Sequence, residues 1–307
     1  MVTTRWSDSE NSILENVLER LLQIPEDDEV GESIAYADWE INKKFNDNPK
    51  IMLNNREISY NLIKYSYNQI SSGSQPIEDR TIPKNGFIVV YSNGVGISYI
   101  ISRNSDGMKL LRKMLKYSGR NEISKNTFDI ESDFFVWLIS KVYTGANVIE
   151  TESETLGNIS LDTIKGFKGD TEDLLNKVSA TGESVINIIS TLSFLLESKN
   201  LNQIKLDLEY RNHENIELVL TNNGTVTTSL ERYQGEYEDL DEDQLLAKLY
   251  LLIYIEILPL LVQAYKTDID NDNWNSQKNI EFLKMVAADL SQKVETRIDM
   301  LEKTNIR

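Results

Sequence analysis

The feature that most limits the fold of this chain is an apolar stretch at residues 245–265, interrupted mainly by Lys248, Glu256 and Gln263. The stretch is far longer than an ordinary strand of about 5–6 residues, and its Leu, Ala and Lys residues favour a helix. We therefore predict a helix at about residues 241–266. Because this helix is apolar nearly all round, it has to be buried on most of its faces, in a core, an oligomer interface or a membrane.

Two residues within this helix restrict its environment and its shape. Glu256 lies in the middle of the most apolar part, which disfavours a membrane-spanning role. Pro259 lacks a backbone N–H and should kink or split the helix near Ile255. A second long helix is predicted at residues 276–303, where apolar residues recur at near-heptad spacing. The two helices are expected to form a C-terminal helical hairpin over residues 236–307, whose remaining apolar surface would join copies of the chain.

The N-terminal region, residues 1–75, is predicted to be mainly helical. Its first helix has apolar residues at i, i+3 and i+4 spacing over residues 9–23. Further helices are expected at residues 33–45 and 56–70. The Ser-Ser-Gly-Ser-Gln-Pro sequence within residues 71–83 is typical of a linker, so we place a domain or subdomain boundary there.

Residues 84–145 and 146–235 are expected to form two further regions that mix strands and helices. The first contains a β-hairpin around Asn93 and Gly94, because Asn-Gly between β-branched runs is a strong turn signal. The second contains a strand, a helix and then a three-stranded antiparallel meander with alternating apolar and charged residues. The predicted fold class is α+β, with the hairpin and the meander packed against helices. The helices of the first region are expected at residues 106–117 and 132–143.

Composition limits the classes of protein to which the chain can belong. The formal net charge is −17, and the chain contains no Cys. A strongly acidic surface opposes indiscriminate coating of nucleic acid. The absence of Cys excludes disulfides and thiolate chemistry and fits a reducing compartment. No signal peptide is visible at the N-terminus, so a cytoplasmic protein is expected.

Only residues 86–145 carry an excess of basic residues, 8 against 5 acidic residues. Four of the eight share one face of the predicted helix at 106–117, because they recur at i, i+3, i+4 and i+7. This face is either solvated or paired with the protein's own acidic regions, or it binds nucleic acid or an acidic partner. The four residues are Lys109, Arg112, Lys113 and Lys116, and Arg103 and Arg120 flank the helix.

Catalytic signals are weak throughout the sequence, so an enzyme is disfavoured and no cofactor, metal or small-molecule substrate is expected. His213 is the only histidine and is placed in a polar turn, which argues against a Ser-His-acid triad or a histidine metal site. One enzymatic alternative stays open. Asp207 and Glu209 on a predicted strand, followed by Arg211, could serve a Mg²⁺-dependent nuclease.

The order of elements over residues 86–266 is β-hairpin, basic helix, strand with helix, three-stranded meander and C-terminal helices. This layout resembles that of accessory proteins of bacterial anti-phage systems, of the Kiwa B-subunit or lambdoid RexA type. The likeness is one of layout without a diagnostic motif, so it assigns no functional residue. It implies a dimeric or higher assembly that binds DNA while a membrane-bound partner protein acts with it.

Three hypotheses for the function follow. The first is a non-enzymatic cytoplasmic binding subunit of a larger assembly, which binds DNA through the basic residues in bacterial antiviral defence. The second is a protein-interaction or structural subunit without nucleic-acid binding, whose basic helix docks on an acidic protein. The third is the Mg²⁺-dependent nuclease. A homo-oligomer formed through the C-terminal helices is expected, with a second protein as a further partner.

Overall fold

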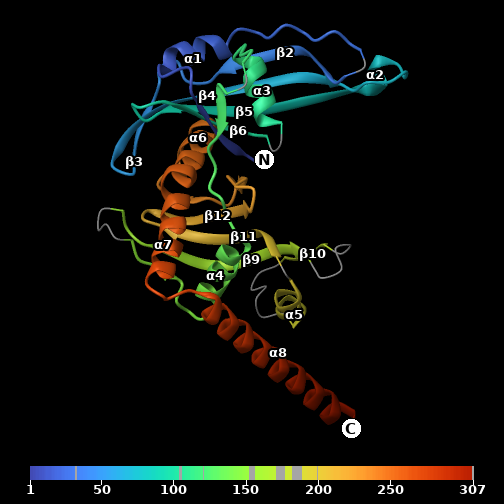
Figure 1. Cartoon of the computed structure of the whole chain (residues 1–307), viewed down its shortest axis with the longest axis vertical. Coiled ribbons are helices and arrows are strands. Elements are labelled where there is room, and N and C mark those ends of the chain that lie inside the picture. The colour runs from blue at the N-terminus through green and yellow to red at the C-terminus, as the bar shows by residue number, and fades with distance from the viewer. Residues whose placement is uncertain are drawn as a thin grey trace. The chain divides into compact units, whose positions relative to one another are not determined.

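The computed structural model describes residues 1–31, 33–103, 106–119, 121–151, 156–170, 177–181, 189–198 and 200–305. They form an α+β protein of helices and antiparallel sheets, as predicted (Figure 1). The chain divides into two compact units. Unit 1 comprises Met1–Thr127 and Asp239–Glu256, and unit 2 comprises Phe128–Glu238 and Ile257–Arg307. Each unit is therefore built from two separate stretches of chain.

The sheet of unit 1 has the strand order β2-β4-β5-β6-β1-β7, and β3 also pairs with β4. All of these pairs are antiparallel. The strands are β1 (Thr4–Asp8), β2 (Ala35–Lys43), β3 (Lys50–Leu53), β4 (Arg56–Ile70), β5 (Thr81–Ser92), β6 (Ile97–Ile101) and β7 (Ile123–Lys125). The helices of this unit are α1 (Leu14–Leu21), α2 (Ile77–Arg80), α3 (Gly107–Met114) and α6 (Glu242–Leu252).

Helices cover both faces of this sheet (Figure 1). The amphipathic helices α1 and α3 place Leu18 and Leu111 on one face, where they join a buried cluster with Ile63 of β4. The opposite face lies against α6, whose Tyr250 ring is 5.4 Å from the ring of Phe87 on β5. The sheet is thus the middle layer of the core of unit 1.

The predicted helices at residues 33–45 and 56–70 are wrong, because these segments form β2 and β4. The strand β4 is covered on both faces, so that the consecutive residues Leu62 and Ile63 are both fully buried. Apolar and polar residues alternate in each half of β4, but the phase of the alternation changes at these two residues, so no single two-residue period runs through the whole strand. In β2, a bulge at Asp38, which has a φ of 56°, interrupts the alternation as well.

The predicted hairpin is confirmed, since β5 and β6 pair on either side of Asn93 and Gly94, and Gly94 has the positive φ of 82° that such a turn requires. The predicted helix at 106–117 is confirmed as α3, and that at 132–143 as α4 (Ser132–Tyr143). The segment 71–83, expected to be a linker, connects β4 to β5 through α2, and these two strands are neighbours in one sheet. It therefore lies inside unit 1.

Unit 2 contains the predicted strand, helix and meander. Its sheet has the order β10-β9-β11-β12-β13, with β8 paired to β9 and β14 paired to β12. The strands are β8 (Val148–Ile149), β9 (Ile159–Asp170), β10 (Lys177–Thr181), β11 (Asn200–Tyr210), β12 (His213–Thr221), β13 (Val226–Thr228) and β14 (Gln234–Gly235). Besides α4, the helices are α5 (Ile189–Glu197), α7 (Leu258–Asp270) and α8 (Ser276–Asn305). On one face of the sheet, α4 packs against β9 and β11.

The apolar stretch that dominates the sequence forms α6, a π-helical turn at Ile253–Ile257, and α7. The distortion expected near Ile255 is therefore confirmed, because Pro259 has no N–H to bond the carbonyl four residues earlier. The 29-residue segment Glu242–Asp270 is long and apolar enough to cross a membrane, but 67% of its most apolar window is buried inside the protein. The segment is thus compatible with a core helix of a soluble protein.

The predicted C-terminal helical hairpin is wrong in its packing. In the part of unit 2 that the structure describes, α8 packs against α5 and α4 rather than along α7. The ring of Tyr143 at the end of α4 lies 5.7 Å from that of Phe282, and its hydroxyl donates to Asp289 of α8. These contacts hold the first half of α8, whereas its second half is exposed.

Candidate functional site

The basic residues predicted as a binding surface do lie around α3. This helix turns Leu110, Leu111 and Met114 into the core, so its charged residues face outwards. Their exposure differs, however. Lys109 and Lys116 are exposed, whereas Arg112 and Lys113 are partly buried. Arg120 lies outside the described residues, so it cannot be placed on this surface.

Acidic and aromatic groups of unit 1 hold Lys113 and Lys109. The Nζ of Lys113 lies 2.5 Å from Oδ1 of Asp28, in the acidic loop that follows α1. Both ammonium groups also lie over the ring of Tyr36, at 5.2 Å for Lys109 and 5.9 Å for Lys113. A cation over an aromatic face is attracted by the ring's negative charge distribution. The helix face is therefore partly neutralised from within.

Arg112 and Arg103 are engaged within unit 1 as well. The Nε of Arg112 lies 3.8 Å from Oε2 of Glu122, a carboxylate that is almost fully buried. Arg103 donates from Nη2 to the Tyr67 hydroxyl at 2.9 Å and lies 5.8 Å from the centre of the Tyr65 ring. Neither guanidinium is presented as an open phosphate contact.

Lys116 borders a polar hollow of about 560 Å³ at the end of α3. Its backbone has a φ of 55°, and its Nζ donates to the side-chain oxygen of Gln23 at 3.2 Å. Arg20 of α1 lines the same hollow, together with Asn11 and Tyr117. In this hollow, Lys116 and Arg20 lie together with the side chains of Asn11 and Tyr117 and with the carboxylates of Glu10 and Glu122.

The Asp8 carboxylate anchors the wall beside this hollow. One of its oxygens accepts hydrogen bonds from the hydroxyls of Tyr99 and Tyr117, the latter at 2.7 Å. The other accepts from the backbone N–H groups of Glu10 and Asn11 at 2.8 and 2.9 Å. Burial raises the pKa of the Tyr99 hydroxyl above its ordinary value, so this hydroxyl stays protonated and donates to Asp8. The arrangement orders the chain between β1 and α1.

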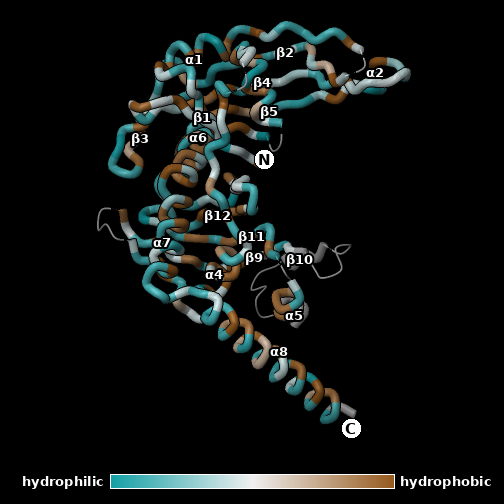
Figure 2. The backbone as a smooth tube through the Cα atoms, in the orientation of Figure 1, coloured by the Kyte–Doolittle hydropathy of each residue, from teal (hydrophilic) through white to brown (hydrophobic). Residues whose placement is uncertain are grey.

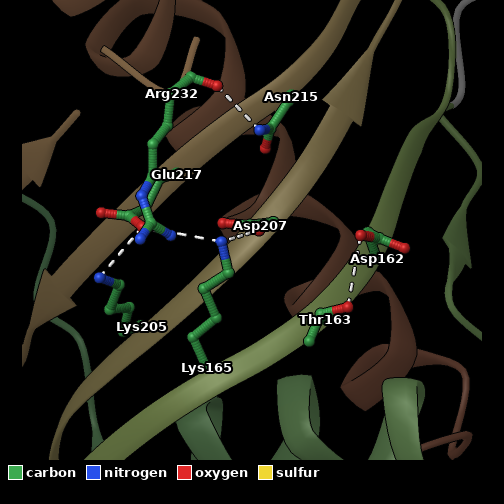
Figure 3. A network of polar contacts seen from close by, with 8 residues as sticks. All are labelled: Asp162, Thr163, Lys165, Lys205, Asp207, Asn215, Glu217 and Arg232. Carbon is green, nitrogen blue, oxygen red and sulfur yellow. Dashed lines mark hydrogen bonds and ion pairs between the residues drawn. The ribbon is translucent and has the colours of Figure 1, made fainter. Parts of the chain in front are cut away.

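A charged cluster crosses the sheet of unit 2 (Figure 3). Asp207 of β11 and Glu217 of β12 are direct cross-strand partners, and both are almost fully buried. Like charges in this relation repel each other. Lys165 of β9 pairs with Asp207 and lies 3.7 Å from Glu217, whose Oε2 is also 3.0 Å from Lys205 and 3.2 Å from Arg232. These five residues are called the charged cluster below.

The charged cluster changes the interpretation of the nuclease residues. Asp207 meets Lys165 and Glu217 rather than Glu209, which is exposed, while the Nε of Arg211 donates to the carbonyl of Leu156. Three cations already surround the two carboxylates. A divalent metal ion would therefore have to displace Lys165 while Lys205 and Arg232 repel it. Among the described residues, no group of three or more acidic or histidine side chains is placed to hold a metal.

His213 lies in β12 and is buried, although the sequence placed it in a polar turn. Its Nδ1 is 2.6 Å from the Tyr233 hydroxyl, and its ring packs edge-on against Tyr237 with the centroids 4.7 Å apart. Burial lowers the pKa of His213 from its ordinary 6.5 to about 4. The imidazole is therefore neutral at pH 7 and acts as a packed core residue.

A groove of about 570 Å³ in unit 2 lies between α4, α7 and the segment that contains β8. At one side, Lys141 of α4 forms an ion pair of 2.7 Å with Asp268 of α7, and Trp137 donates from Nε1 to the same carboxylate at 2.8 Å. Burial alone would raise the pKa of Asp268, but the hydrogen bonds from Lys141 and Trp137 lower it below its ordinary value. The other walls of the groove include Leu156, Leu260 and Ala264.

Comparison with known proteins gives a short result. No protein-family model and no curated protein matches this chain.

The sequence did not reveal the groove of unit 2, because its polar side is assembled over a large separation. Trp137 and Asp268 are 131 positions apart. The one signal available was the i, i+4 spacing of Trp137 and Lys141 on a predicted helix, which places an indole and a cation on the same side. Arg20, which lines the hollow of unit 1, was missed for the same reason, since it lies on α1, far from Lys116 in the sequence.

Proposed function

We propose that the chain is a non-enzymatic cytoplasmic binding subunit that assembles with a second copy of itself through α8. The observation that supports the proposal is the second half of this helix. It carries an exposed apolar stripe of Val294, Ile298 and Leu301, each between 40% and 49% exposed. Hydrophobic residues recur along this half among hydrophilic ones (Figure 2). The spacing of four and three residues is that of a coiled-coil seam.

The residues around the stripe favour a second copy as its occupant. With Val294 and Leu301 as d positions, Ile298 is an a position, and Ile at a with Leu at d favours two parallel strands. Arg297 then flanks the stripe on one side and Glu302 on the other. In a parallel pair these two flanks face each other, so that Arg297 of one copy meets Glu302 of the other. The helix is therefore complementary to itself in both shape and charge.

The test is the mass of the protein in solution by light scattering. Ile298→Glu places a carboxylate in the seam and is expected to convert a dimer to a monomer, because an unpaired charge in an apolar interface is strongly unfavourable. The matched control is Met300→Glu, which introduces the same charge on the outer side of the same helix and should leave the dimer intact. A wild-type monomer at all concentrations would contradict the proposal, as would an Ile298→Glu variant that remains dimeric.

The second candidate function is nucleic-acid binding at unit 1, which the resemblance in layout to anti-phage accessory proteins suggests. The observation in its favour is that Lys109 on α3 and Lys116 just past its end are both exposed, and that Lys116 shares a polar hollow with Arg20. Lys and Arg beside amide and hydroxyl donors suit phosphate contacts. Under this candidate, the protein would bind DNA within a defence assembly that includes a second, membrane-bound protein.

The double variant Lys109→Glu/Lys116→Glu tests this candidate without disturbing the pairs of Lys113 and Arg112 with Asp28 and Glu122. Its affinity for short duplex DNA should fall, and the slope of log affinity against log salt should decrease by about 2, because two phosphate contacts are lost. The control Lys266→Glu/Lys284→Glu makes the same charge change at two exposed lysines of unit 2. Equal effects of the two double variants, or no effect of either, would remove nucleic-acid binding from consideration.

A further inference from the structure

We infer that the groove of unit 2 binds an extended peptide, which adds as a strand to the free edge of β8 and carries an apolar side chain next to a basic one. This goes beyond the proposed assembly through α8 and does not depend on it. The inference rests on three features of the groove: a helix face, a strand edge and an unbalanced charge.

One wall of the groove is a single face of α7. The residues of α7 and its C-terminal end that line the groove recur at intervals of three and one, from Leu260 to Asn271. At 1.5 Å per residue this face is about 16 Å long, which is the length of about five residues of extended chain. Its members are Leu260, Gln263, Ala264, Thr267, Asp268 and Asn271.

The opposite wall is the edge of a strand. Four consecutive residues, 148–151, line the groove. The first two form β8 and the next two continue the chain beyond it. Because neighbouring side chains of a strand point to opposite faces, the consecutive lining residues Val148 and Ile149 mean that the main chain itself runs along the wall. A groove between a helix and a strand edge is the arrangement in which peptides bind by strand addition.

The register shows which backbone groups are free at this edge. Ile149 pairs with Ile159, and the N–H of Leu161 donates to the carbonyl of Asn147 at 2.8 Å. Hydrogen-bonded pairs alternate in an antiparallel ladder, so Asn147 and Ile149 face β9 and Val148 faces away. In the described part of the chain, no hydrogen bond engages the backbone N–H or C=O of Val148. Val148 is 53% exposed. An unpaired N–H and C=O at a sheet edge are ready to pair with another strand.

The lining defines the chemistry of the peptide. Leu156, Leu260 and Ala264 offer an apolar site for one anchoring side chain. Lys141 and Asp268 neutralise each other at 2.7 Å. Glu150 is exposed and has no ion pair among the described residues, so the groove carries one uncompensated negative charge. A Lys or Arg beside the apolar anchor would complement it.

The test is a selection from a phage-displayed library of random linear peptides against the full-length protein. The expected result is an enriched motif of an apolar residue beside Lys or Arg. A synthetic peptide of that motif should lose binding to Ala264→Arg, which fills the groove, but not to the control Lys266→Arg, which alters an exposed residue of α7 that does not line it. N-methylation of alternate amides of the peptide should also abolish binding, because it blocks pairing with a strand edge.

Val148→Pro provides a second variant whose effect is specific to strand addition. It removes the N–H that faces away from β9 and keeps the pairs that Asn147 and Ile149 make with β9. The affinity of the selected peptide should fall roughly tenfold, the effect of one lost hydrogen bond. Failure to enrich any motif would overturn the inference. Binding that survives Ala264→Arg would overturn the groove as the site, and binding that tolerates both N-methylation and Val148→Pro would overturn strand addition.

Discussion

Replacing Lys165 with Met is expected to lower the free energy of unfolding by about 3–5 kcal/mol. The Lys165 side chain is only 14% exposed, and it lies between Asp207 and Glu217, which face each other across β11 and β12. Without its ammonium group, Asp207 loses its cation and two buried carboxylates repel each other. Equilibrium unfolding in urea at pH 7 would measure the loss.

Two controls distinguish this result from a general effect of removing a lysine. Lys50→Met breaks an ion pair with Glu57 in which both side chains are more than half exposed, and it should cost at most about 1 kcal/mol. The triple variant Lys165→Met/Asp207→Leu/Glu217→Met removes the buried charges together, and it should recover much of the lost stability. If Lys165→Met cost no more than Lys50→Met, the charged cluster would not stabilise unit 2 in the way described.

The second large effect is a loss of folding stability at acidic pH, which is expected because His213 is buried in its neutral form. The buried imidazole has a pKa of about 4 in the folded protein, whereas an unfolded chain binds the proton near pH 6.5. Between these values the unfolded state holds more protons than the folded one, so stability falls as the pH falls from about 6.5 towards 4. Protonation of the unfolded chain should therefore remove about 2 kcal/mol between pH 7 and pH 5.

The variant His213→Gln isolates this contribution from that of the many carboxylates. It keeps an amide beside the Tyr233 hydroxyl but cannot titrate in this range. The variant should have a lower free energy of unfolding than the wild type at pH 7. The difference between the two proteins should be smaller by about 2 kcal/mol at pH 5. A difference that stays constant between the two pH values would show that His213 is not held neutral by its burial.

Local signals predicted the elements whose residues determine their own conformation. The Asn93-Gly94 turn needs a positive φ, which Gly supplies, so the hairpin followed from two residues. The apolar run of α4 and the alternation of β11 were equally direct. In contrast, the alternation of β4 changes phase at Leu62 and Ile63, and one face of the strand is covered by α6, which lies far along the sequence. Tertiary packing therefore decided what local propensity could not.

The position of the basic residues was predictable, but their partners were not. The spacing predicted four cations on one helix face; Lys109, Arg112 and Lys113 do lie on α3, whereas Lys116 lies past its end with a φ of 55°. Lys113 reaches Asp28 across 85 positions of sequence, and nothing in the local pattern points to that pairing. The same limit applies to the charged cluster, where alternation on β11 predicted a solvated strand face. Only the neighbouring strands show that Asp207 and Glu217 are buried together.

The late position of α6 in the chain has a consequence for synthesis on the ribosome. All the strands of unit 1 are complete by Lys125, but one face of their sheet is covered by a helix that begins at Glu242. Arg5 of the first strand donates to the carbonyl of Tyr254 at 2.8 Å, a residue that is made about 250 positions later. While the whole of unit 2's sheet is being translated, the nascent unit 1 sheet presents this apolar face uncovered, and such surfaces are where chaperones and aggregation compete.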